Sequence, residues 1–296
     1  MGWIRAFSGI VRLQVDVRER DGAREVSFVS LRGLSPTLKS ISLVYGTSVT
    51  SSEIFDLVCS FSLLEDLTLV SRERNNEDGR WNIPSTSPKL TGCLDLKIVG
   101  GIRPAVRRLL ELPSGLHFSK IAVTYFSKDV EPAMDLISKC SDTLESLSIC
   151  YCNMGAFFLY QLLWLIDILP PPVSIAPVGT RQPDLSNLKR LKEVFWMSGP
   201  SVQWITVTLQ TVESTNLSQI IIRFSIILWA SVEQPFHREW RDLDRLLLQF
   251  WISHSIRPRI EYGREEVEHG LRELGPRLLP ELTSRGIVDL VEYEGY

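Results

Sequence analysis

The sequence lacks an excess of charge of either sign. Its 32 basic and 35 acidic residues give a net charge of −3 at pH 7, and they are mixed along the chain. A protein that binds the phosphate backbone of nucleic acid needs a surface with a clear basic excess. We therefore expect no nucleic-acid partner.

Long hydrophobic runs are also absent. The most apolar stretches, FFLYQLLWLIDIL (157–169) and IIIRFSIILWA (220–230), are shorter than the roughly 20 residues of a membrane-spanning helix, and each contains a charged residue. Arg5 and Arg12 interrupt the apolar N-terminal stretch that a signal peptide would need. These features predict a protein of the cytosol or nucleus that has no membrane partner.

Residues suited to metal binding are few, with five cysteines and four histidines. Cys140, Cys150 and Cys152 lie close together, but a zinc site needs about four ligands, and neither a CxxC pair nor a nearby histidine pair completes the set. Glu265 and His269 are one helical turn apart and form an equally incomplete pair. We expect no metal and no cofactor, with a redox-sensitive thiol as the alternative. The odd number of cysteines agrees with reduced thiols.

Common catalytic motifs are missing as well. The sequence contains no GxSxG, P-loop, GxGxxG or HExxH string. We expect that the chain is not an enzyme. The alternative is a hydrolase whose catalytic residues come together from distant segments.

What the sequence does contain is an internal repeat. Hexamers of the form LxxLxL, or close to it, start at positions 10, 38, 64, 91, 118, 144, 191 and 217, so that successive spacings are 28, 26, 27, 27, 26, 47 and 26. Regular spacing on this scale is a signature of a solenoid. The one long spacing contains the Pro-rich excursion PPPVSIAPVGTRQP (170–183). We assign residues 1–230 to the repeats and 231–296 to a C-terminal region that caps the same solenoid.

Alternation within each hexamer predicts a β-strand. Residues four and six of a strand point to the same face, and all sixteen residues at these positions are apolar. Segments with helical signals follow the strands, among them a capping box formed by Thr50 and Glu53. Strand followed by helix predicts an α/β unit that buries its apolar face only when stacked on its neighbours.

The N-terminal segment has a second interpretation. VRLQVDVRERDGAREVSFVSL (11–31) contains two alternating runs joined around Asp21 and Gly22, which predicts a β-hairpin. Such a hairpin would cap the exposed first edge of the sheet. The alternatives are a true first repeat and the remnant of a larger N-terminal domain.

The unit LESLSICYCNM (144–154) resembles the longer subtype of the leucine-rich repeat family. Cys152 stands where that family uses Cys or Asn to bond loop backbone. The resemblance implies a horseshoe arc, with parallel strands on the concave face and helices on the convex face.

The C-terminal region adds a narrower resemblance. EWRDLDRLLLQF (239–250), the strand-like IRPRIEYG (256–263) and RLLPELTSRGIVDLVEYE (277–294) are similar to the closing segment of F-box and leucine-rich-repeat proteins of mushroom-forming fungi. The specific residues are those of the W-x-x-L-D and L-P-x-L-x-x-R-G-I forms, namely Trp240, Leu243, Asp244, Leu279, Pro280, Leu282, Arg285, Gly286 and Ile287.

This second resemblance implies that the chain recruits substrates to a ubiquitin ligase through an adaptor that binds the F-box. The residues before Ile10 are too few to hold an F-box. We therefore expect either a truncated or divergent member of the family or a standalone binding or inhibitor module.

In a leucine-rich arc, positions three, five and seven of each unit face the partner. Exposed aromatic and Met residues beside a polar rim suit protein recognition. The partner-binding residues that we predict on this basis are Asp66, Thr68, Val70, Asp95, Lys97, Lys120, Thr124, Ser146, Ser148, Cys150, Phe195 and Met197.

Overall fold

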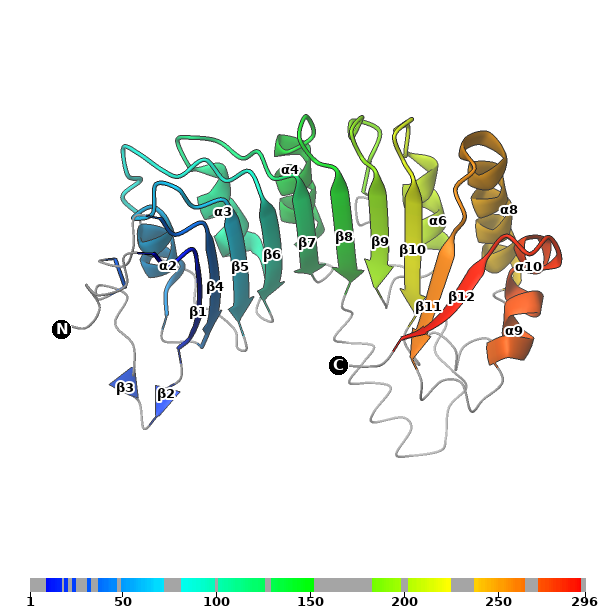
Figure 1. Ribbon diagram of the computed structural model, residues 1–296, viewed down its shortest axis with the longest axis horizontal. Helices are drawn as coiled ribbons and strands as arrows, with labels where there is room; N and C mark the ends of the chain where they lie inside the picture. The colour runs from blue at the N-terminus through cyan, green and yellow to red at the C-terminus, as the bar shows by residue number, and fades with distance from the viewer. Residues whose placement is uncertain are drawn as a thin grey trace. The chain divides into compact units, whose positions relative to one another are not determined.

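The computed structural model describes residues 9–17, 19–20, 23–24, 31–32, 37–46, 49–71, 81–98, 101–125, 129–151, 183–197, 202–224, 237–263 and 271–293. The chain divides into two compact units, residues 1–144 and 145–296. Each unit contains a parallel sheet with helices on one of its faces (Figure 1). Cys152, the apolar run 157–169, residues 170–182 of the Pro-rich excursion and the pair Glu265 and His269 lie outside the described residues.

The sheet of the first unit has the strand order β1-β4-β5-β6-β7, and all its strands are parallel. The strands are β1 (Arg12–Asp16), β4 (Ser40–Tyr45), β5 (Asp66–Ser71), β6 (Cys93–Ile98) and β7 (Lys120–Tyr125). Each begins two residues after the start of its predicted hexamer. Equivalent positions pair across the sheet, so that Ile41 lies opposite Leu67 and Leu67 lies opposite Leu94.

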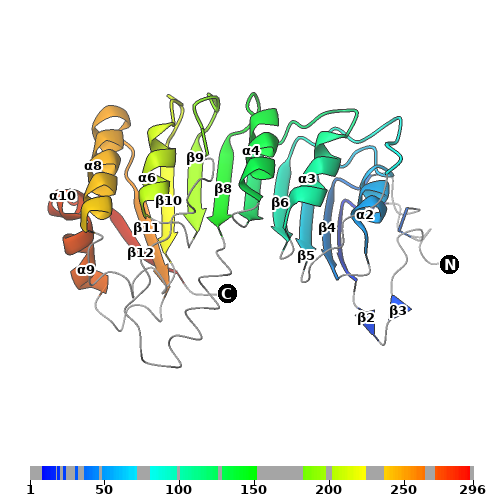
Figure 2. The same cartoon turned by 180° about the vertical axis from the view of Figure 1, so that it is seen from behind.

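The helices of the first unit are α2 (Ser51–Val58), α3 (Arg103–Leu110) and α4 (Val130–Lys139). They cover one face of the sheet, as the view from behind shows (Figure 2). The predicted capping box at the start of α2 is confirmed. The Glu53 amide donates to Thr50 Oγ1 at 3.2 Å, and the Thr50 amide donates to Glu53 Oε2 at 3.0 Å.

Trp81 fills the helix side of the sheet between β5 and β6, where the described part of the connection, residues 81–92, contains no helix. Its ring lies 6.0 Å from that of Phe55 in an edge-on arrangement, and its Nε1 donates to Asp56 Oδ1 at 2.9 Å. The Arg108 guanidinium lies 5.2 Å from the centre of the Trp81 ring. One side chain therefore links α2 to α3 in place of a helix.

The sheet of the second unit has the order β8-β9-β10-β11-β12 and is also parallel. Its strands are β8 (Ser146–Tyr151), β9 (Glu193–Met197), β10 (Gln219–Phe224), β11 (Arg259–Gly263) and β12 (Asp289–Tyr293). Its described helices are α6 (Val202–Gln210), α8 (His237–His254), α9 (Leu271–Leu278) and α10 (Pro280–Ser284). The parallel sheet thus continues through the region after residue 230, where β11 and β12 follow the eight strands of the predicted repeats.

The N-terminal segment combines both sequence interpretations. β2 (Glu19–Arg20) and β3 (Ala23–Arg24) form an antiparallel hairpin around residues 21–22, as predicted. The hairpin is shorter than expected, because the preceding run forms β1, which pairs with β4 in the parallel sheet. The first alternating run is therefore a strand of the main sheet.

The core lies between each sheet and its helices. Every predicted inward residue at positions four and six is buried except Leu13, which is half-buried. The exception lies on β1, whose only neighbour in the sheet is β4. Burying a leucine side chain contributes about 2 to 3 kcal/mol to folding, so these paired residues are the main source of stability.

In the part of the chain that the structure describes, no helix combines the length and the apolar character needed to cross a lipid bilayer.

The difference between central and edge strands can be measured. We expect Leu96→Ala, which empties a fully buried site on β6, to lower the free energy of unfolding by about 3 kcal/mol. Leu13→Ala on β1 should cost less than about 1 kcal/mol, because Leu13 is already partly in water. Urea unfolding followed by circular dichroism gives both values, and equal costs would contradict this description of the core.

Candidate functional site: the open faces of the two sheets

In each unit the described helices lie on one face of the sheet and leave the opposite face without a helix (Figures 1 and 2). We call this second face the open face. Side chains alternate along a strand, so positions three, five and seven of each repeat lie on the open face when positions four and six are buried. This alternation places all twelve residues predicted to bind a partner on the open face, and they differ in their exposure to solvent.

On the first unit, Asp66 stabilises the sheet itself. Its Oδ1 accepts a hydrogen bond from the Cys93 amide at 2.7 Å, which links the start of β5 to the start of β6. The approach is so close that a Cβ added to Gly92 would lie 1.9 Å from Asp66 Oδ1. A side chain at position 92 would therefore displace the Asp66 carboxylate, which is already engaged within the chain.

The rest of the described open face of the first unit carries charges of both signs. Lys97 Nζ pairs with Asp95 Oδ2 at 3.0 Å, and the Lys97 side chain is 54% exposed. An exposed pair of this kind contributes about 0 to 1 kcal/mol. Thr68 and Val70 on β5 are half-buried. On β7, Thr124 is also half-buried and Lys120 is exposed.

On the second unit, the prediction for Cys150 needs correction. Ser146 and Ser148 on β8 are half-buried, but Cys150 on the same strand is only 9% exposed. Little of its thiol is accessible to a partner. Alternation along the strand assigns Cys150 to the open face, but it does not determine how closely neighbouring side chains pack over that position.

The most constrained part of the open face is a cluster that spans three strands of the second unit. The Arg223 guanidinium on β10 lies 4.9 Å from the centre of the Phe195 ring on β9. Its Nε donates to Glu261 Oε2 on β11 at 2.8 Å, and the two side chains are 16% and 5% exposed. Arg259 Nε lies 2.9 Å from Glu261 Oε1. We call Phe195, Arg223, Arg259 and Glu261 the arginine cluster.

Of the arginine cluster, only Phe195 was among the predicted partner-binding residues, and Arg223, Arg259 and Glu261 were not. Glu261 lies beyond the last predicted repeat, and it meets Arg223 only because β11 pairs with β10 in the register that places them opposite each other. Aligning the strand-like IRPRIEYG with the hexamers would have been the signal for this contact.

The pair of Arg223 and Glu261 should behave as one energetic unit. We expect Glu261→Ala to destabilise the protein by about 3 kcal/mol, because it leaves the Arg223 guanidinium without its carboxylate and with little access to water. Arg223→Ala should cost less, because Glu261 keeps its ion pair with Arg259. The double variant should cost about 1 to 3 kcal/mol less than the sum of the two. Urea unfolding of the four proteins in a double-mutant cycle measures this coupling, and additive losses would contradict it.

Of the four described cysteines, Cys140 and Cys150 are buried, whereas Cys59 and Cys93 are half-buried. Burial raises the pKa of Cys140 to about 11, while a backbone hydrogen bond with Phe118 opposes this shift. Burial also raises the pKa of Cys59 to about 11, assisted by the charge of Asp56. A thiol with such a pKa is a poor nucleophile and a poor metal ligand at neutral pH. Within the described residues, no three potential metal ligands come together.

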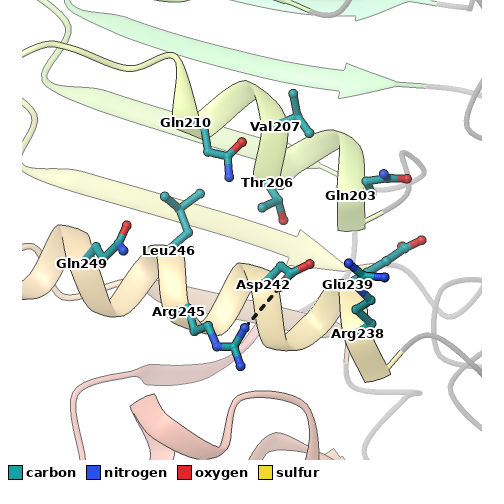
Figure 3. A pocket seen from close by; sticks show the side chains of 10 residues that line it. All are labelled: Gln203, Thr206, Val207, Gln210, Arg238, Glu239, Asp242, Arg245, Leu246 and Gln249. Atoms are coloured by element: carbon teal, nitrogen blue, oxygen red, sulfur yellow. Dashed lines mark ion pairs between the residues drawn. The ribbon is translucent and has the colours of Figure 1, made fainter.

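A groove of about 540 Å³ lies on the helix side of the second unit, between α6 and α8 (Figure 3). Thr206, Val207 and Leu246 contribute its less exposed lining. Burial raises the pKa of Glu239, and a hydrogen bond with the Gln203 backbone opposes the shift. The other lining residues are exposed polar and charged side chains of both signs, namely Gln203, Gln210, Arg238, Asp242, Arg245 and Gln249. This mixture does not select a particular ligand.

The W-x-x-L-D and L-P-x-L-x-x-R-G-I stretches of the C-terminal region come into contact at Asp244. This residue is 1% exposed on α8, and its carboxylate accepts hydrogen bonds from the amides of Glu281 at 2.8 Å and Leu282 at 3.2 Å. Both amides belong to the first turn of α10, where amides have no partner within the helix. Asp244 therefore caps α10 from another helix.

The end of α10 explains the Arg-Gly-Ile part of the motif. Gly286 has a φ of +65°, a left-handed conformation that glycine adopts without strain. The Gly286 amide donates to the Thr283 carbonyl at 3.0 Å, and the Ile287 amide donates to the Leu282 carbonyl at 3.1 Å. These two bonds form a Schellman motif, which ends the helix and leads the chain into β12.

Two replacements of Asp244 should separate the effect of its hydrogen bonds to α10 on stability from the effect of its ionisable carboxyl group. We expect Asp244→Ala to cost about 1 to 2 kcal/mol, because the α10 amides lose their acceptor in a buried position. Asp244→Asn keeps one acceptor oxygen and should cost less. Unfolding in urea at a series of pH values measures both variants.

The pH dependence follows from burial, which raises the pKa of Asp244 above its ordinary value, while the amides of Glu281 and Leu282 oppose the shift. A carboxyl group with a raised pKa in the folded state binds its proton more tightly there, so its contribution falls as pH rises through that pKa. The stability of the wild type relative to Asp244→Asn should therefore decrease as pH rises above the pKa of an unfolded aspartate, about 3.9. An increase over this range would contradict the assignment.

No family model matches this chain, and no curated protein matches it. The leucine-rich-repeat and F-box resemblances therefore stay predictions from the sequence.

Proposed function

We propose that the chain is a leucine-rich-repeat solenoid that binds a protein partner through the open face of its sheets. The observation that supports this proposal is the one-sided placement of the described helices on each sheet. The opposite face presents Phe195, Met197 and small polar residues that are partly accessible. A parallel sheet usually has both faces covered, so an open face needs a reason, and recognition of a partner supplies one.

The biological role that we propose is recruitment of this partner to a ubiquitin ligase in the cytosol or nucleus. This part rests on the similarity of the Trp240 and Leu279 motifs to the fungal F-box proteins. The second candidate is a standalone binding or inhibitor module, which uses the same open face but does not associate with a ligase adaptor.

A pair of matched variants tests the binding face. Ser148 lies on β8 opposite Phe195 of β9, and Gln210 is exposed on α6. We expect Ser148→Arg to place a long charged side chain on the open face and to prevent binding. Gln210→Arg makes the same change of charge on the helix side and should leave binding intact.

The measurement is affinity capture of the two variants and the wild type from an extract, followed by quantitative mass spectrometry. A partner that is recovered with the wild type and Gln210→Arg but lost with Ser148→Arg would support the proposal. Equal recovery with all three proteins would refute it. Recovery of a ligase adaptor with the wild type distinguishes the ligase role from the standalone module.

A further inference from the structure

We infer that the partner presents an acidic side chain next to an apolar one, and that the arginine cluster binds this pair. The inference rests on the proposed function, because it names the chemistry of the partner at the open face. It would make Arg259 the residue that contacts the partner carboxylate and Phe195 the residue that contacts the apolar side chain.

The arginine cluster has an excess of positive charge. In the arginine cluster two guanidinium groups share one carboxylate, that of Glu261, so the cluster has a net charge of about +1. Arg257 lies two residues before β11, and its Nε is paired with Asp289 Oδ1 at 2.8 Å, so the Asp289 carboxylate is already engaged. Among the strand residues that the structure describes on this face, Glu193 is the other acidic one, and it lies opposite Ser146 and Gln219 at the start of β9.

The hydrogen bonding of Arg259 within the chain is incomplete. Its Nε is buried without a hydrogen-bond partner, although Glu261 Oε1 lies 2.9 Å away, so the geometry of this ion pair is not that of a hydrogen bond. The Arg259 side chain is 41% exposed, whereas the Glu261 side chain is only 5% exposed. A second carboxylate would approach the exposed part of the Arg259 side chain from solvent, not the buried Nε, and form charge-assisted hydrogen bonds that Glu261 does not supply.

An apolar surface lies beside the two guanidinium groups. Phe195 and Met197 are half-buried, and Ile221 lies opposite Phe195 on β10. Arg223 is held against the Phe195 ring by Glu261, so it is ordered before a partner arrives. Ordered arginine and aromatic residues lose little entropy on association, which is why they are common at the centres of interfaces.

The test is a selection of random dodecapeptides displayed on phage against the full chain. We expect the selected peptides to contain Asp or Glu beside Leu, Ile, Phe or Met. Arg259→Gln should weaken the binding of such a synthetic peptide about tenfold, and Arg259→Lys, which keeps the charge, should weaken it less. Arg238→Gln, on the helix side of the same unit, removes the same charge and should leave binding unchanged.

Binding should also weaken when the salt concentration is raised from about 0.05 M to about 0.5 M, because exposed charges are screened over that range. Thermal unfolding of each variant establishes that it is folded before its affinity is compared. The inference is overturned if the selection yields no binding peptide, if the selected peptides have no excess of acidic residues, or if Arg259→Gln binds them as the wild type does.

Failure of this inference is distinguishable from failure of the proposed function. If Ser148→Arg loses the captured partner while Arg259→Gln keeps it, the open face binds a protein but the acidic contact is wrong. If both variants keep every captured protein, the proposed function itself is wrong.

Discussion

The structure depends on packing two apolar residues from each of the eight repeat strands, β1 and β4 to β10, on the helix side of its sheet. This constraint recurs at intervals of 26 to 28 residues over most of the repeats, and it fixes which face of the sheet is inward. Leu67 and Leu69 on β5 are fully buried, as are Leu94 and Leu96 on β6. Because a shift by one residue would turn each apolar pair towards solvent, the same pairs also fix the register between neighbouring strands.

The open face is a consequence of this arrangement. Once positions four and six are inward, the residues between them face the other way, and their chemistry is no longer determined by the core. On the first unit these positions hold a mixture of charged residues of both signs and small polar residues. On the second unit they hold the arginine cluster, in which Glu261 orders Arg223 against Phe195. The fold thus places the apolar core on the helix side, and the open face that we propose for recognition holds polar, charged and aromatic side chains.

The sequence predicts the eight repeat strands and the Thr50 cap because each depends on residues close together in the chain. It does not reveal β12, because the hexamer that would end at Glu292 has no apolar sixth residue, and Leu290 at its fourth position is 38% exposed. The contacts of Asp244 and Glu261 are also hidden, because each joins residues more than thirty positions apart through packing that a local pattern does not specify.

The most direct test of the account is hydroxyl-radical footprinting of the chain with and without its captured partner. Phe195 and Met197 react readily with hydroxyl radicals and lie on the open face, whereas Ile252 is 63% exposed on α8. The account predicts that the partner protects Phe195 and Met197 and leaves the modification of Ile252 unchanged. Protection of Ile252 without protection of Phe195 and Met197 would show that the partner binds the helix side and would contradict recognition by the open face.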